Sequence, residues 1–221
     1  MFKMKKITKV EPKFFTSYFE KERPETWEEL SRAIGYDIRT YMLSGISPDG
    51  EEINPSEQNY QCAYTELDIE PEGSSSHVDH FRKQSMFQAH NYIFNWINLF
   101  TACNSNDYGA KHKDRNIQKE DYEYLINPAI DNPSKYITYN LLGKAIEASQ
   151  DTNSKDFKIA KKTIDLFNLN ERSLKAHRLS VSKQVQSVCN QLPLVEIKAD
   201  IGKFDSFVEF VFKSCVEIDE N

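Results

Sequence analysis

The sequence has few cysteines and no long apolar stretch. Its 221 residues include four cysteines, too few and too scattered for the disulfide framework of a small secreted protein. No stretch approaches the roughly 20 apolar residues that a transmembrane helix requires. The first residues, MFKMKKITKVEPKFF, lack the apolar region of a secretory signal peptide. We therefore expect a cytoplasmic protein without a membrane span.

Positive charge is also scarce. The chain carries 28 Lys and Arg against 34 Asp and Glu, a formal net charge of −6. A negative net charge opposes the binding of nucleic acid, so such binding would depend on local basic patches. Residues 155–183 hold eight Lys and Arg against three acids. That run permits phosphate binding, although a solvated helix face is the more common reason for it.

The N-terminal part of the chain carries clear helix signals. The whole chain of 221 residues, with 39% hydrophobic residues, is long and apolar enough for one large domain or two small ones with a genuine core. Thr26 and Glu29 fit a capping box, and apolar residues follow at helical spacing up to Gly45, where the helix should stop. Residues 46–60 are polar and rich in turn formers, which predicts a loop.

The C-terminal third is predicted to be mainly helical. Asn170 is a candidate N-cap for a helix with one stripe made of Leu174, His177, Val181, Val185 and Val188. The final segment, KFDSFVEFVFKSCVEI, is apolar on more than one side. It suggests a surface covered by another protein, and burial in the chain's own core is an equally good explanation.

Between residues 61 and 115 the pattern changes to short pieces. QCAYTE predicts a brief extended segment, HVDHF and INLFTAC predict two strands, and NSNDYGAKHKDR predicts a turn that enters a short polar helix. The first strand carries Asp79 and His80, and Asn98 opens the second. A histidine can deprotonate water near neutral pH, a divalent cation can stabilise a scissile phosphate, and an amide can orient the histidine. Taken alone, the pattern His77-Val78-Asp79-His80 is more typical of a polar surface loop than of a catalytic site.

Four segments together resemble an HNH endonuclease: residues 62–66 (CAYTE), 77–83 (HVDHFRK), 94–103 (FNWINLFTAC) and 109–114 (GAKHKD). The flanking segments KKITKVEPKFF, YLINPAIDNPSKYITY and TIDLFNLNERSL narrow the resemblance. They are similar to the HNH proteins encoded beside an ABC/SMC-like ATPase in Septu-type anti-phage defence, related pairs of which occur with some retrons. The resemblance extends from about residue 4 to 180.

The resemblance implies an α+β fold in which a ββα-metal core (61–120) lies between helical regions (1–60 and 121–221). It also implies a Mg²⁺- or Mn²⁺-dependent endonuclease that acts on nucleic acid, DNA first and RNA as the alternative. Its partner would be the ATPase. His80 would be the general base, Asn98 would orient it and Asp79 would bind metal. His112 would be the second metal ligand, as the third residue of the motif, with Asp114 or Asp107 as the alternative. Further candidates for metal or phosphate contacts are Asp114, Lys113 and Arg82.

The chain departs from the family at the structural zinc site. Many HNH relatives bind zinc through two Cys pairs, but here only Cys62 and Cys103 remain, with Thr65 and Asn106 or Tyr108 at the partner positions. Two thiolates alone do not make a tetrahedral site. We expect no structural zinc, and packing around Tyr64, Phe94 and Trp96 in its place. His77 or His90 completing a Cys₂His₂ set is the alternative, and the eroded site also leaves open a non-catalytic adaptor.

Overall fold

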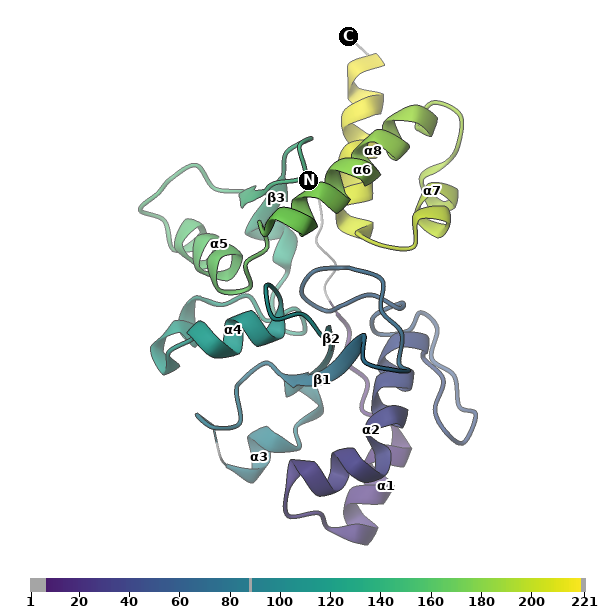
Figure 1. Cartoon of the computed structure of the whole chain (residues 1–221), viewed down its shortest axis with the longest axis vertical. Coiled ribbons are helices and arrows are strands. Elements are labelled where there is room, and N and C mark those ends of the chain that lie inside the picture. Colours follow the sequence, from purple (N-terminus) through teal and green to yellow (C-terminus); the bar gives the residue numbers. More distant parts are fainter. Residues whose placement is uncertain (1–6, 88, 220–221) are drawn as a thin grey trace. The chain divides into compact units, whose positions relative to one another are not determined.

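The computed structural model describes residues 7–87 and 89–219. This part of the chain forms eight α-helices and two antiparallel sheets of two strands each, so the fold is α+β as predicted (Figure 1). It divides into two compact units. We call residues 7–63 and 69–104 the N-terminal unit, and residues 64–68 and 105–219 the C-terminal unit. The predicted core at 61–120 is thus divided between both units.

The N-terminal unit combines two long helices with one β-hairpin. Its elements are α1 (Lys13–Glu22), α2 (Trp27–Ser44), β1 (Ser76–His80), α3 (His90–Ile93), the 3-10 helix η1 (Trp96–Asn98) and β2 (Leu99–Cys103). The capping box at the start of α2 is present, with Glu29 N donating to the Thr26 hydroxyl and the Glu29 side chain accepting from Thr26 N. Gly45 ends the helix in the left-handed region, at φ 80°.

The apolar face of α2 packs against the hairpin. The core consists of Phe15, Leu30, Ile38, Tyr41, Met42, Phe94, Trp96 and Leu99. β2 is buried along its whole length and pairs with β1 so that Asp79 lies opposite Phe100 and His80 opposite Leu99. Because its partner strand is fixed in this core, the end of β1 has a defined position.

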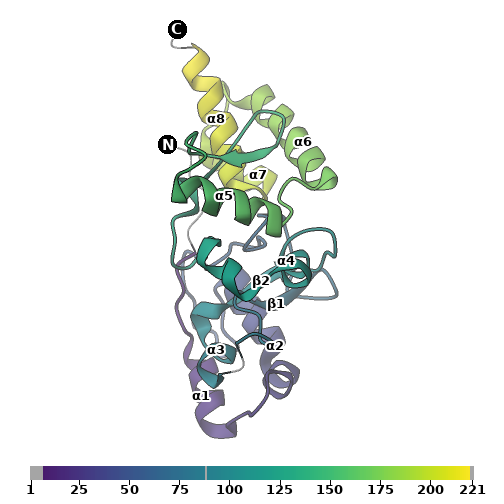
Figure 2. The ribbon, with the colours of Figure 1, turned by 90° about the vertical axis from the view of Figure 1, so that its left-hand side faces the viewer.

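The C-terminal unit is mainly helical, as predicted. Its elements are α4 (Ala110–Asn116), η2 (Lys119–Tyr124), η3 (Pro133–Lys135), β3 (Ile137–Tyr139), β4 (Ala145–Glu147), α5 (Lys155–Leu166), α6 (Arg172–Val188), α7 (Leu194–Ile201) and α8 (Asp205–Asp219). α6 and α8 pack against each other (Figure 1, Figure 2). No helix in the described residues is both long enough and apolar enough to cross a membrane.

The start and the buried face of α6 differ from the prediction. Glu171 is the N-cap, because its carboxylate accepts from the first backbone N–H groups of the helix. The amide of Asn170 instead forms two hydrogen bonds with the backbone of Ala145. His177 is exposed, and the neighbouring Arg178 takes the buried position.

Arg178 is buried because the C-terminal unit supplies acceptors for its charge. Its Nη1 donates to the carbonyls of Gly143 at 3.1 Å and Leu169 at 2.8 Å. The guanidinium carbon also lies over the ring of Tyr139, 5.4 Å from its centroid. These contacts stabilise the buried cation, and its Nε has no hydrogen-bond partner in the described residues. Hydrophobic periodicity does not anticipate this arrangement.

The apolar residues in the first half of α8 are covered by the chain itself, and Val216 near its end is exposed. Phe207, Val208 and Val211 are fully buried, and α8 packs against α6, α7 and β3. The expected surface for a partner is therefore part of the core of the C-terminal unit. At the start of α8, the carboxylate of Glu66 accepts from Ser206 N at 3.1 Å and Ser206 Oγ at 2.5 Å. The segment around Glu66 forms turns, not the extended strand that we predicted.

Candidate active site

The two best candidates for catalysis lie side by side at the end of β1. Asp79 is 3% exposed and His80 is 7% exposed. The imidazole of His80 packs edge-on against Trp27, with ring centroids 4.5 Å apart. We expected a histidine that faces solvent, and the structure places it in a largely dry position instead. Electrostatic interactions are stronger in such a position than at the surface.

The tautomer of His80 is set by the backbone. Its Nε2 lies 2.9 Å from the carbonyl oxygen of Ile93. A carbonyl oxygen only accepts, so Nε2 carries the proton. Nδ1 is then the nitrogen with the lone pair in the neutral ring, as a general base requires. Gln84 Nε2 lies 3.3 Å from His80 Nε2 and is also a donor, so it makes no hydrogen bond with the protonated nitrogen.

Asn98 joins the two segments that hold His80. Its Oδ1 accepts from Arg82 N at 2.7 Å, and its Nδ2 donates to the carbonyls of Tyr92 at 2.8 Å and Arg82 at 3.3 Å. Arg82 follows His80 by two residues, and Tyr92 precedes the carbonyl that binds Nε2. Asn98 thus acts on His80 through the backbone, without a direct bond to the imidazole.

Arg82 places a cation next to this pair. Its guanidinium carbon lies 5.1 Å from the centroid of the Phe87 ring and 5.5 Å from that of Tyr92. These distances are within the range of cation–π contacts. Because Arg82 is only partly buried, its charge remains near the surface beside the end of β1.

The other candidates belong to the C-terminal unit. His112 on α4 has Nδ1 2.8 Å from the carbonyl of Leu166, which leaves its lone pair on Nε2. Metal-bound histidines commonly have this arrangement. Asp114 follows two residues later, about 200° further around the helix, so the two side chains project to nearly opposite sides of α4. Asp107 is exposed in the turn before α4.

Lys113 does not have the surface position that we expected of a phosphate contact. Its side chain is fully buried, and Nζ lies 3.1 Å from Asp114 Oδ1. Nζ also lies 5.8 Å from the ring centroid of Tyr64 and 5.9 Å from that of Phe167. This environment gives Lys113 an internal role in the C-terminal unit.

The chemistry of the candidate ligands suits a hard divalent cation. Asp79 offers carboxylate oxygens, and α4 offers either an imidazole or a second carboxylate. Within residues 7–87 and 89–219, no three His, Cys, Asp or Glu side chains group as a metal site. The assignment of metal ligands therefore rests on donor type and stays a prediction.

The two cysteines left from the zinc motif lie together. Cys62 and Cys103 are buried with their Sγ atoms 3.5 Å apart, and Cys103 N donates to Cys62 Sγ. The aromatic residues expected to replace zinc do not form one cluster. Tyr64 stacks on Phe167 in the C-terminal unit, with centroids 4.5 Å apart, while Phe94 and Trp96 belong to the core of the N-terminal unit. The side chain of His90 lies outside the described residues.

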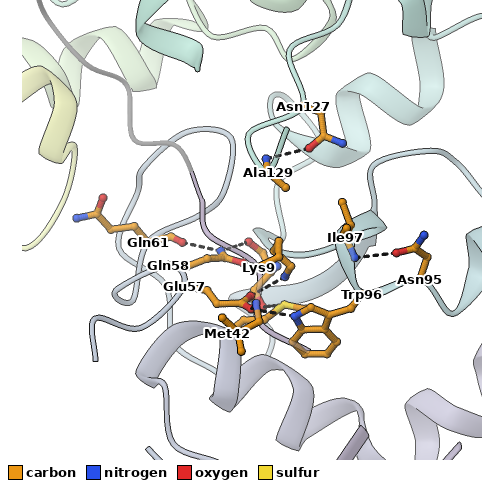
Figure 3. Close-up of polar contacts among 12 residues, drawn as sticks. Lys9, Met42, Glu57, Gln58, Gln61, Asn95, Trp96, Ile97, Asn127 and Ala129 are labelled. Carbon is orange, nitrogen blue, oxygen red and sulfur yellow. Dashed lines mark hydrogen bonds and ion pairs between the residues drawn. The ribbon is translucent and has the colours of Figure 1, made fainter. Parts of the chain in front are cut away.

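A buried ion pair that the sequence did not reveal supports the hairpin (Figure 3). Glu57 accepts from Lys9 Nζ at 2.6 Å, Val10 N at 2.8 Å and Trp96 Nε1 at 2.8 Å. Burial lowers the pKa of Lys9 to about 8, against the opposing effect of Glu57. The next residue, Gln58, forms two hydrogen bonds from its amide to the backbone of Thr101 in β2. The loop thereby covers the outer edge of β2.

In comparisons with known proteins, no family model and no curated protein matches the chain. The candidate site is therefore defined by its own geometry: a buried Asp–His pair on a hairpin, a backbone-fixed tautomer and an asparagine clamp.

Proposed function

We propose that the protein is a metal-dependent endonuclease of the HNH type that hydrolyses phosphodiester bonds, with DNA as the first candidate substrate. The observation that carries this proposal is the state of His80. His80 Nε2 donates a hydrogen bond to the Ile93 carbonyl, so Nδ1 is the basic nitrogen of the neutral ring. The order Asp79-His80, Asn98 and α4 along the chain is the order of the HNH motif.

In this reaction His80 Nδ1 takes the proton of the attacking water. Asp79 would hold the cation, and the resemblance alone offers His112 or Asp114 as a further ligand. The bound cation would stabilise the charge that develops on the phosphate and the leaving oxygen. Asn98 keeps the base in place, and Arg82 offers positive charge for a neighbouring phosphate.

The cellular setting is part of the proposal. By resemblance, the protein is the nuclease of an anti-phage defence pair and works with an ABC/SMC-like ATPase. Its net charge of −6 supports dependence on a partner, because phosphate contacts supply most non-specific affinity for nucleic acid. The surface that binds the partner is not the buried face of α8.

A non-catalytic adaptor is the second candidate. The deep burial of Asp79 and His80 favours the adaptor, because a catalytic pair must be accessible to a water molecule and to a phosphate. The retained tautomer and clamp favour the nuclease, because an adaptor has no need of either.

The test is cleavage of supercoiled plasmid, and of an RNA of the same sequence, with Mg²⁺ or Mn²⁺ and with or without the ATPase. His80→Gln can still donate to the Ile93 carbonyl but offers no base, so its rate should fall by about 10²–10⁴-fold. His177→Ala, at an exposed position on α6, should retain the full rate. A His80→Gln protein that cuts at the parental rate contradicts the nuclease. A wild-type protein that cuts under none of these conditions supports the adaptor.

A further inference from the structure

The C-terminal unit contains a cavity that the nuclease proposal does not use. It lies between α4, η2 and α5 and has a volume of about 730 Å³. Sites for small molecules commonly have volumes of this order. The basic run that the sequence places at 155–183 supplies three of its lining residues, Lys158, Lys161 and Lys162.

The three lysines project from one face of α5. Lys161 pairs with Asp165 at 3.2 Å, and Lys162 pairs with Asp121 at 2.7 Å. In the part of the chain that the structure describes, Lys158 has no carboxylate within ion-pair distance. Like charges three and four residues apart on a helix repel each other. Asp165, which also lines the cavity, and Asp121 offset two of these charges, so a bound anion would pair chiefly with Lys158.

The other walls of the cavity are aromatic and polar. Tyr124 and Phe157 line it and are half-buried, so each keeps part of its ring exposed. His112 lines it as well, with its Nδ1 proton committed to the Leu166 carbonyl and the Nε2 lone pair left as an acceptor. A cavity that combines lysines, aromatic rings and a hydrogen-bond acceptor suits a ligand with a phosphate and a planar polar ring.

We propose that this cavity binds a nucleoside phosphate, with the phosphate among the lysines and the base against Tyr124 or Phe157. A free nucleotide and an unpaired nucleotide within a single strand both carry a phosphate and a base, so both fit this description of the ligand. The proposal does not rest on nuclease activity. His112 is the one residue shared with the candidate active site, and it stays unchanged in the test.

The test measures binding of ATP by calorimetry and of a fluorescent single-stranded oligothymidine by anisotropy, both at low salt with EDTA. Lys158→Glu reverses a charge inside the cavity, and Lys155→Glu makes the same change at an exposed position of α5 outside its lining. We expect Lys158→Glu to weaken binding by at least about tenfold and Lys155→Glu by less than about twofold, because electrostatic attraction falls with distance from the phosphate. Thermal unfolding confirms that each variant is folded.

A second variant tests the role of the base. Tyr124→Ala should weaken ATP binding and leave binding of inorganic pyrophosphate, which has no base, unchanged. Binding of ATP would identify a free nucleotide, and binding of the oligothymidine alone would identify a single strand; both support the cavity. If neither probe binds, or if Lys155→Glu and Lys158→Glu weaken binding equally, the proposal is wrong. EDTA prevents turnover, so a failed nuclease assay leaves these results intact.

Discussion

His80 donates its Nε2 proton to the Ile93 carbonyl, and Asn98 binds the preceding carbonyl, that of Tyr92. The base is therefore oriented by a short stretch of backbone that a second side chain holds in place. Misplacing a catalytic group by about 1 Å can cost about 100-fold in rate. The effect of Asn98 should consequently be visible both in stability and in cleavage.

Asn98→Ala should reduce the free energy of unfolding by about 1–3 kcal/mol, because the partly buried backbone N–H of Arg82 and the Tyr92 carbonyl lose their partner. The cleavage rate should fall by about 10–100-fold as His80 loses its fixed position. Urea unfolding and single-turnover cleavage measure the two effects. Asn95→Ala is the control, since Asn95 is exposed and, in the described residues, its side chain bonds only to Ile97 N at the start of η1 (Figure 3). Equal behaviour of the two variants would rule out the clamp.

At the scale of elements, the hairpin depends on a loop that the sequence identifies only as polar. The side chain of Gln58 forms hydrogen bonds with the outer backbone edge of β2, and Glu57 in the same loop bonds to Lys9 and to Trp96. A buried ion pair is costly to break from one side, because the remaining charge stays in a medium of low polarity.

Lys9→Met should lower the free energy of unfolding by about 3–5 kcal/mol, because the buried carboxylate of Glu57 loses its only cation in the described residues. Adding Glu57→Gln should recover at least half of that loss, since glutamine can still accept from Trp96 Nε1 and Val10 N. Urea unfolding followed by tryptophan fluorescence gives both values. A double variant less stable than Lys9→Met would show that the charge of Glu57 is not the cause.

The sequence predicts those elements whose signals are local. The α2 capping box, the strand β1 and the apolar run of β2 each depend on residues within a few positions of one another, and all three are present, although burial along β1 does not alternate as we predicted. Glu57 and Arg178 are missed because their partners lie far along the chain. In the candidate site, Asp79, His80 and Asn98 follow from the motif. The burial of His80 and the backbone role of Asn98 require the folded chain.

The contact between Cys62 and Cys103 leads to a prediction about zinc. Purified protein should contain well under one equivalent, because two thiolates supply half of a tetrahedral site. EDTA should stop cleavage without changing the midpoint of thermal unfolding. Elemental analysis and calorimetry measure the two quantities. One equivalent of zinc, together with a lower midpoint in EDTA, would show that other ligands complete the site.

At the scale of the whole molecule, the net charge and the burial of apolar side chains together determine how the protein can bind nucleic acid. Phe207, Val208 and Val211 of α8 are buried within the C-terminal unit, so these residues do not need a partner to cover them. The excess of acids remains. In the proposed function, the protein therefore depends on a partner for positive charge. This dependence is measured as the change in DNA affinity with salt concentration.

The isolated protein should bind duplex DNA weakly, with a dissociation constant no tighter than the roughly 1–100 μM of non-specific complexes at physiological salt. Its few exposed cations near the candidate active site, such as Arg82, make only a small number of phosphate contacts, so binding should weaken modestly as salt rises. Adding the proposed ATPase partner should strengthen binding and steepen this dependence, if that partner contributes further Lys and Arg contacts. Fluorescence anisotropy at several salt concentrations, with and without the ATPase, measures both quantities. Nanomolar binding by the lone protein at physiological salt would contradict the proposal, as would an ATPase that leaves affinity and salt dependence unchanged.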